Sequence, residues 1–303
     1  MLKTIQANRQ FKKGSSSRKI KTFLTEKVVF LNGILTIIVL GVILALLIYN
    51  SIRFFASYPA TSFFGGLKWS PTNDKFGFVP LLTGSLLTTF ASILIAIPLG
   101  IGCAIYIGEL APRVVREILK PIIEVLATIP SVVIGFIGIK LVAPFIKDVF
   151  NLSIGLTALT GAVMLAFMSL PTIVSISEDA INAVPNRYRY ASLALGATKW
   201  ETTYKVVVPT ASSGMLAAVM LGLGRIVGET MTVLMLTGNS PRIVFSFLQP
   251  VRTITATIAA EMGETAQGGL HYSALFAIGL ILFLITFAIN FIGDSFTNRI
   301  KKM

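Results

Sequence analysis

Cysteine and histidine are almost absent from this sequence. The 303 residues include one cysteine, Cys103, and one histidine, His271. A single cysteine excludes a disulfide within the chain and a cysteine metal cluster. A single histidine excludes a multi-histidine metal site and argues against a Ser-His-Asp hydrolase. We therefore expect no catalytic residues, no metal site, no cofactor and no enzymatic activity in this chain.

Charged residues are also scarce. They make up 13% of the chain, whereas hydrophobic residues make up 54%. One soluble core cannot hide this much apolar surface, so the composition predicts an integral protein of a lipid bilayer. The formal net charge is +13. Because the basic residues gather at the ends of apolar segments, as membrane topology requires, we expect no nucleic-acid partner.

Six apolar stretches are long enough to cross a hydrocarbon core of about 30 Å. The first, 28–55, is too long for the apolar region of a secretory signal, so we expect it to remain in the mature protein. The other five lie at 82–110, 118–141, 153–176, 211–236 and 272–293. Together they predict an all-α integral membrane fold with six transmembrane helices.

The distribution of lysine and arginine predicts the orientation. With the N-terminus inside, the inner segments hold 18 of these residues and the outer connections hold 7. Positive residues are retained on the cytoplasmic side, so both termini are expected in the cytoplasm. The expected organisation is a basic, flexible cytoplasmic tail at 1–27, an external loop at 56–81, a core at 82–298 with a cytoplasmic loop at about 177–209 and an external loop at about 237–271, and a cytoplasmic C-terminus at 299–303.

The cytoplasmic loop has a pattern of small residues followed by a proline. Ala191, Ser192 and Ala197 allow close packing against a partner, Gly196 permits a turn, and Pro209 begins the next span. This pattern predicts a short helix, a turn and a second helix. The alternative is that Gly196 only ends an amphipathic surface helix.

The same loop resembles the coupling loop of ABC importer permeases, in which Glu-Ala-Ala is followed at fixed spacing by Gly and by Ile-x-Leu-Pro. Tyr190-Ala191-Ser192, Gly196 and Pro209 match that spacing. Tyr190 stands where the family has glutamate, so the ion pair of that glutamate is not expected here. The resemblance implies that Tyr190, Ala191, Ser192, Gly196, Ala197 and Pro209 contact an ATP-binding subunit.

Two charges lie inside the fifth apolar stretch. Arg225 and Glu229 are four residues apart, so on one helix they would share a face. An arginine at membrane depth costs about 2.5–3.5 kcal/mol on insertion scales, so it faces a partner, a cavity or a substrate path. The functional interpretation is an anion passage lined by Arg225, with Glu229 orienting or neutralising it. The alternative is an ion pair that fixes helix packing or closes a gate.

Other acidic residues are less informative. Glu124 in the third stretch is expected to pair with Arg113 or Arg116 near the helix end. Glu261 and Glu264 lie in the second external loop, where a binding protein is expected to dock. The apolar part of that loop, from Val251 to Met262, predicts an interfacial or re-entrant helix.

Beyond the coupling loop, the chain resembles the PstC-type permeases of bacterial phosphate ABC importers. The segments that carry the resemblance are 69–71 with 76–77, 97–112, 124–135 and 224–231. It implies a type I ABC importer permease in the bacterial inner membrane, with a cytoplasmic coupling helix. The implied partners are a second permease of PstA type, two ATP-binding subunits of PstB type and an external phosphate-binding protein of PstS type.

The expected function is therefore transport of inorganic phosphate through a path formed with a second permease. The chain contains no Gly-x-x-x-x-Gly-Lys-Ser/Thr run, so ATP hydrolysis is expected on a separate subunit. One alternative is an ABC permease for sulfate, molybdate or another oxyanion. Another is a stand-alone anion channel or carrier.

Overall fold

The computed structural model describes residues 2–300, with side chains for residues 22, 23 and 25–297. The chain divides into two units, Met1–Asn50 and Ser51–Met303. The first unit is part of helix α1 (Leu2–Ser57), which contains an apolar stretch at Thr25–Ser57 long enough to span a membrane. Residues 2–27, which the sequence analysis expects to form a tail, are helical, because α1 begins at Leu2.

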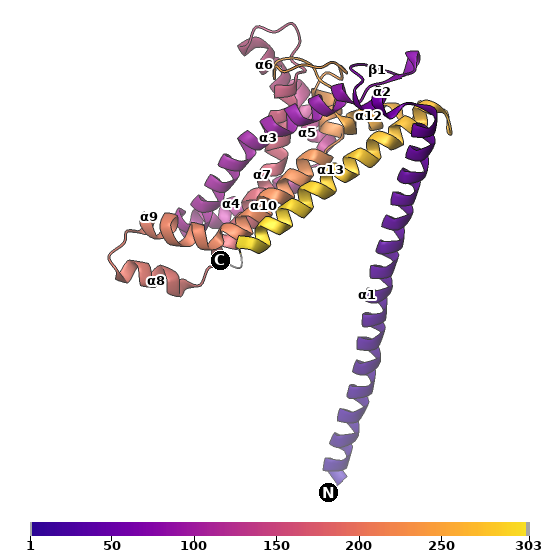
Figure 1. Ribbon diagram of the computed structural model, residues 1–303. Helices are drawn as coiled ribbons and strands as arrows, with labels where there is room; N and C mark the ends of the chain where they lie inside the picture. Colours follow the sequence, from indigo (N-terminus) through magenta and orange to yellow (C-terminus); the bar gives the residue numbers. More distant parts are fainter. Residues whose placement is uncertain (1, 301–303) are drawn as a thin grey trace. The chain divides into compact units, whose positions relative to one another are not determined.

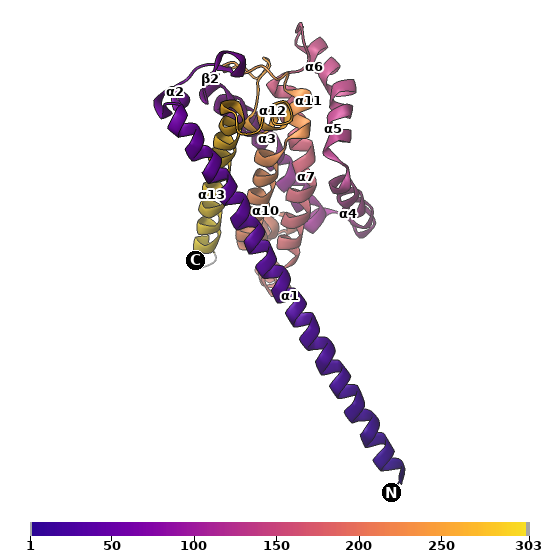
Figure 2. The ribbon, with the colours of Figure 1, turned by 90° about the vertical axis from the view of Figure 1, so that its right-hand side faces the viewer.

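The second unit is helical apart from one short hairpin. After Ser57 its elements are α2 (Ala60–Phe64), β1 (Trp69–Ser70), η1 (Pro71–Asn73), β2 (Lys75–Phe76), α3 (Val79–Ile105), η2 (Tyr106–Leu110), α4 (Arg113–Thr128), α5 (Ser131–Ile137), η3 (Gly138–Val142), α6 (Ala143–Val149), α7 (Ala158–Asn182), α8 (Asn186–Ala194), α9 (Lys199–Thr202), η4 (Thr203–Val207), α10 (Val208–Gly228), α11 (Met231–Leu236), α12 (Ile254–Glu261) and α13 (Leu270–Ile300). In Figures 1 and 2, α8 and α9 lie at the opposite end of the helix bundle from β1, α2 and α12.

The expected all-α membrane fold is confirmed. Within the described residues, five helices are long and apolar enough to cross a membrane, or six if the bent pair Arg113–Thr128 and Ser131–Val149 is one span. That pair is bent by 98°. The prediction of one continuous third helix at 118–141 is therefore wrong. Pro130 is the reason, since a proline and the residue before it disfavour helical continuation.

The predicted fifth span at 211–236 is also not one helix. It is divided into α10 and α11, and Glu229 at the break has extended backbone angles, φ −68° and ψ 133°. The other spans differ from prediction mainly at their ends. The fourth, for example, is α7 at Ala158–Asn182 rather than 153–176. Of the predicted C-terminal segment 299–303, residues 301–303 lie outside the described residues.

Small residues allow the central helices to pack closely. Ile173 of α7 lies between Gly100 of α3 and Gly222 of α10, and a Cβ added to either glycine would come within 2.7 Å and 2.5 Å of the isoleucine side chain, respectively. In a bilayer, where apolar burial between helices provides little drive, such close contacts supply van der Waals attraction. The α3, α7 and α10 helices therefore form a tightly packed centre.

A second packed region gathers aromatic side chains at the hairpin end. Phe54, Phe63, Trp69, Phe76 and Phe78 are all at most 4% exposed. Their rings contact one another edge-on or stacked at centroid separations of 5.3–5.8 Å. The predicted external loop at 56–81 is thus an ordered cap over α12 and α13.

Replacing Gly84 with alanine is expected to destabilise the protein. The added Cβ would lie 2.3 Å from the carbonyl oxygen of Arg252, which packs against this turn of α3. Overpacking of this kind costs about 1–3 kcal/mol. Thermal unfolding of the detergent-solubilised protein should show a Tm several degrees below that of the wild type.

Gly102→Ala in the same helix is the matched control. No atom lies within 4 Å of a Cβ added there, so this variant should keep or raise the Tm. Equal Tm values for the two variants would contradict the close approach at Gly84.

Candidate functional site

Glu229 lies at the break between α10 and α11 and is hydrogen-bonded through both its side chain and its backbone. Its Oε1 accepts hydrogen bonds from the backbone N–H groups of Met231 (3.0 Å) and Thr232 (3.2 Å). Its carbonyl oxygen accepts a hydrogen bond from the Thr255 hydroxyl at 2.8 Å. Glu229 therefore caps the first turn of α11 and ties the break to α12.

Arg225 lies one turn before this break and is half-buried. Its Nη1 donates to the hydroxyl of Thr172 on α7 at 3.2 Å. Among the ion pairs of the described residues, none includes Arg225. The expectation that Arg225 and Glu229 share one helix face is therefore wrong, because the helix ends at Gly228 and the Glu229 carboxylate caps α11.

The second break, between α4 and α5, lies beside the break between α10 and α11. The hydroxyl of Thr232, in the first turn of α11, donates to the carbonyl oxygen of Ser131 at the start of α5, at 3.2 Å. Two interruptions that are 101 residues apart in sequence thus lie side by side. Broken helices within a membrane are tolerated where protein or a water-filled cavity satisfies the freed backbone groups, which is typical of solute pathways.

The loop at 177–209 has the expected helix, turn and second helix. α8 ends before Gly196, whose φ is +87°, a left-handed conformation that glycine adopts without strain. Thr198 and Glu201 form a reciprocal capping box at the start of α9. The hydroxyls of Ser192 and Thr202 lie 2.9 Å apart and join the two helices.

This loop exposes a set of large apolar and aromatic side chains. Tyr190 is 67% exposed and Leu195 is 89% exposed. Trp200 and Tyr204 are 59% and 66% exposed. Ala191 and Pro209 are also exposed, whereas Ser192 and Ala197 are intermediate. Exposed apolar residues gathered in this way are typical of an interaction surface.

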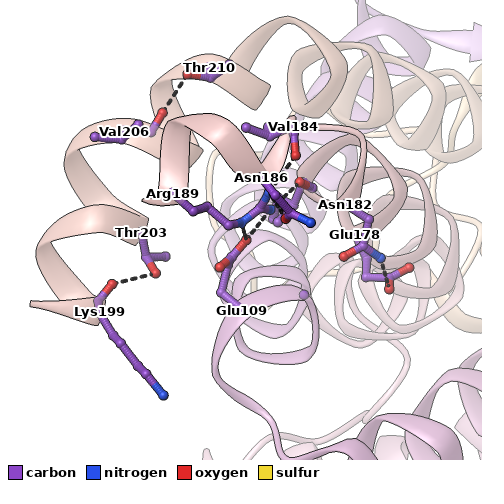
Figure 3. A network of polar contacts seen from close by, with 12 residues as sticks. Glu109, Glu178, Asn182, Val184, Asn186, Arg189, Lys199, Thr203, Val206 and Thr210 are labelled. Carbon is purple, nitrogen blue, oxygen red and sulfur yellow. Dashed lines mark hydrogen bonds and ion pairs between the residues drawn. The ribbon is translucent and has the colours of Figure 1, made fainter. Parts of the chain in front are cut away.

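Arg189, which anchors this loop, is not among the site residues predicted from the sequence. The guanidinium of Arg189 in α8 bonds to Glu109 in η2 and to the carbonyl oxygens of Ile181 and Val184 at the end of α7 (Figure 3). Arg189 and Glu109 are 80 residues apart in sequence. Two charges in separate segments carry no spacing signal, so local pattern could not pair them.

The basic residues of α4 have different partners from those predicted. Arg113 pairs with Glu117 at 2.9 Å, and Arg116 donates to the carbonyl oxygens of Ile107 and Gly108. The expected pairing of Glu124 with Arg113 or Arg116 is therefore wrong. The carbonyl groups at the end of the second span need hydrogen-bond donors, and Arg116 supplies them.

Glu261 is not an exposed docking residue as expected. Its carboxylate accepts from the Trp69 indole at 3.0 Å, pairs with Arg252 Nη1 at 2.7 Å and lies 2.7 Å from His271 Nε2. The side chain is 11% exposed. Glu264, by contrast, is exposed. The carboxylate thus joins the β1–β2 hairpin, α12 and α13.

Within the part of the chain that the structure describes, no group of three or more His, Cys, Asp or Glu side chains is arranged to hold a metal ion. The single histidine lies against Glu261 and packs beside Phe76, with ring centroids 5.9 Å apart.

The chain is similar to known transport proteins. Residues 96–302 match the family model described as "Binding-protein-dependent transport system inner membrane component". The chain is 41% identical over 227 residues to a probable ABC transporter permease, YqgH, of Bacillus subtilis, covering 74% of each chain. It is 38% identical over 287 residues to the phosphate transport system permease protein PstC of Mesorhizobium japonicum, covering 88% of this chain and 87% of that protein.

Solved structures share the fold. A bacterial alginate ABC transporter in complex with its alginate-bound periplasmic protein contains a chain that matches 84% of this one with a TM-score of 0.61 and 15% identity; 88% of that chain is covered. An inward-facing MetNI methionine ABC transporter contains a chain that matches 77% of this one with a TM-score of 0.56 and 19% identity; 99% of that chain is covered. These structures support the fold of an importer permease.

Replacing Glu261 with glutamine is expected to loosen the hairpin end. The change leaves Arg252 without its buried counter-charge, and a hydrogen bond to a charged group contributes about 1.5–3 kcal/mol. The Tm should fall, and in a Trp200→Phe background the emission of Trp69 should shift to longer wavelength as water reaches the indole.

Glu264→Gln is the control for this prediction, since it removes the same charge at an exposed position three residues away. It should leave both the Tm and the Trp69 emission unchanged. If Glu261→Gln behaves in the same way, the carboxylate is not what holds the hairpin.

Proposed function

The chain belongs to the family of binding-protein-dependent transport system inner membrane components, and from this membership we propose that it is the permease subunit of an ATP-driven importer of inorganic phosphate. The relatives named as phosphate transport permeases match most of the chain. These relatives support the assignment of this chain as a permease of PstC type. The protein is a multi-pass protein of the inner membrane.

The observation that supports phosphate as the cargo is that Arg225 has no carboxylate partner among the described residues. Its guanidinium lies in a membrane-spanning helix and bonds to the neutral hydroxyl of Thr172 rather than to a carboxylate. A cation at membrane depth without a counter-charge is costly, and an oxyanion in transit offsets that cost. Arginine presents planar donors that match two oxygens of a phosphate.

Glu229 contributes to the path in a different way from Arg225. By capping α11 it keeps the α10–α11 break beside the α4–α5 break. We place the passage or its gate at these two breaks, where the helices have already given up continuous backbone hydrogen bonding. Movement of either short helix would open or close the path without unfolding a full span.

The energy for transport comes from other subunits. The chain has no phosphate-cradling Gly-x-x-x-x-Gly-Lys-Ser/Thr run, so we assign it no catalytic role. Two ATP-binding subunits of PstB type would supply hydrolysis. A second permease of PstA type would complete the path, and an external PstS-type protein would deliver phosphate.

We place the loop of α8 and α9 in the cytoplasm, together with both termini. The excess of lysine and arginine in the inner segments supports this orientation. The β1–β2 hairpin and α12 then face outward, at the other end of the bundle. The exposed side chains Tyr190, Leu195 and Trp200 form the surface on which an ATP-binding subunit docks.

Replacing Arg225 with glutamine is expected to stop phosphate import. The test uses vesicles that contain this chain with its partner permease, ATP-binding subunits and binding protein, and measures ATP-dependent uptake of labelled phosphate. Loss of charge-assisted hydrogen bonds worth about 1.5–3 kcal/mol predicts a fall of about 10- to 100-fold. Arg225→Lys should retain part of the uptake, because it keeps the charge but not the planar donors.

Lys147→Gln is the control, since Lys147 is an exposed lysine outside the proposed path. It should transport as the wild type does. Competition with sulfate and molybdate tests the cargo directly. If the wild-type complex imports one of these anions and not phosphate, the cargo is wrong; flux that persists without ATP would support a channel instead.

Gly196→Val is expected to weaken docking of the ATP-binding subunit. The residue has φ +87°, and nothing lies within 4 Å of an added Cβ, so the penalty is conformational rather than a clash. A left-handed conformation costs an L-residue about 1–2 kcal/mol and is least accessible to β-branched side chains. Less ATP-binding subunit should co-purify with this variant.

Gly196→Asn is the matched variant, because asparagine adopts positive φ more readily than other non-glycine residues. It should retain most of the co-purified subunit. Equal losses for valine and asparagine would show that the turn conformation is not the determinant.

A further inference from the structure

Helix α8 is attached to the rest of the protein mainly by polar contacts. None of its nine residues, all of which the structure describes, is buried. A helix without a buried apolar face gains little from packing, so its position must depend on specific bonds. The side chain that makes the greatest number of those bonds is Arg189.

Arg189 connects α8 to two membrane-spanning helices. Its Nε and Nη2 donate to Glu109 Oε1 at 3.0 Å and 2.5 Å. Its Nη1 donates to the carbonyl oxygen of Val184 at 2.5 Å, and Nη2 donates to that of Ile181 at 2.9 Å. Glu109 lies beside Arg189 in the last turn of the second span (Figure 3). Ile181 lies in the last turn of α7.

The burial of this pair makes the connection stiff. The side chains of Arg189 and Glu109 are 17% and 13% exposed, so water and salt screen them far less than a surface pair. The fork of the guanidinium fixes direction as well as distance. A lysine at the same position would offer a point charge on a flexible stem.

The helices that receive these bonds lead to the proposed path. Gly108 of the second span lies against Ile181 of α7, with 2.9 Å between the isoleucine Cγ2 and a Cβ added to the glycine. α7 also carries Thr172, which bonds to Arg225. A displacement of α8 therefore moves, through Arg189, the ends of the second span and of α7. Along α7 the movement reaches Thr172, which bonds to Arg225.

We propose that Arg189 and Glu109 form a transmission joint that couples movement of α8 to the second span and α7, so that they act as positioning residues for transport. The inference rests on the proposed function. Tyr190, which stands where the family has glutamate, is 67% exposed, whereas the preceding residue, Arg189, makes its ion pair toward the membrane helices.

The test separates coupling from assembly. The complete complex is reconstituted with wild type, Arg189→Gln, Arg189→Lys or Glu109→Gln, and the ATP hydrolysed per anion imported is measured together with ATP-binding subunit co-purified. We expect Arg189→Gln and Glu109→Gln to raise the ATP-to-anion ratio at least about 10-fold, with normal co-purification. The ATP-to-anion ratio of Arg189→Lys should lie between the ratios of these two variants and that of the wild type.

Two further variants keep the proposal falsifiable. Single substitutions leave one buried charge unpaired and are prone to misfold, whereas the double variant Arg189→Gln with Glu109→Gln leaves a neutral pair of similar volume. It should fold and still show the raised ratio. Arg113→Gln breaks an exposed pair in which Arg113 is 91% exposed, and it should leave the ratio unchanged.

The proposal is overturned if the double variant imports with the wild-type ratio. It is also overturned if the folded variants lose the ATP-binding subunit, because the pair would then only shape the docking surface. Failure of the proposed cargo gives a different result: wild type would import sulfate or molybdate instead of phosphate, and the same ratio measured with that anion would still test the joint.

Discussion

The structure depends on one constraint: every backbone N–H and C=O group within a bilayer needs a protein partner, because lipid offers none. Continuous helices meet this requirement internally, but this chain interrupts two of its spans, after Thr128 and after Gly228. Side chains bond several of the groups freed at these interruptions. The Glu229 carboxylate accepts from the N–H groups of Met231 and Thr232 in the same segment. The hydroxyls of Thr232 and Thr255, from other segments, donate to the carbonyl oxygens of Ser131 and Glu229, respectively.

The same constraint explains where the charged residues lie. Arg116 and Arg189 both bind carbonyl oxygens at the ends of spans, and Glu229 binds N–H groups at the start of a short helix. Each replaces part of the hydrogen bonding that a helix end lacks. Arg225 differs from them, since its recorded bond is to the neutral hydroxyl of Thr172. That difference distinguishes a residue suited to a transported anion from residues that complete the fold.

Close packing then links the two ends of the bundle. Ile173 fits against glycines of α3 and α10, so α7 cannot shift without its neighbours. At one end α7 receives Arg189 from α8, and near its middle Thr172 holds Arg225. In the proposed function, these packed helices connect the loop on which an ATP-binding subunit docks to the path that passes the anion.

The sequence by itself determined the membrane class, most of the spans and the helix-turn-helix loop, because these follow from local apolar length and from spacing such as that of Ala191, Gly196 and Pro209. Only the tertiary structure decided the 98° bend and the partners of Glu229 and Arg189. Glu261 is a further case, since its carboxylate binds an indole 192 residues away in sequence. Such contacts depend on which segments lie side by side, and a local pattern of residues carries no information about distant neighbours.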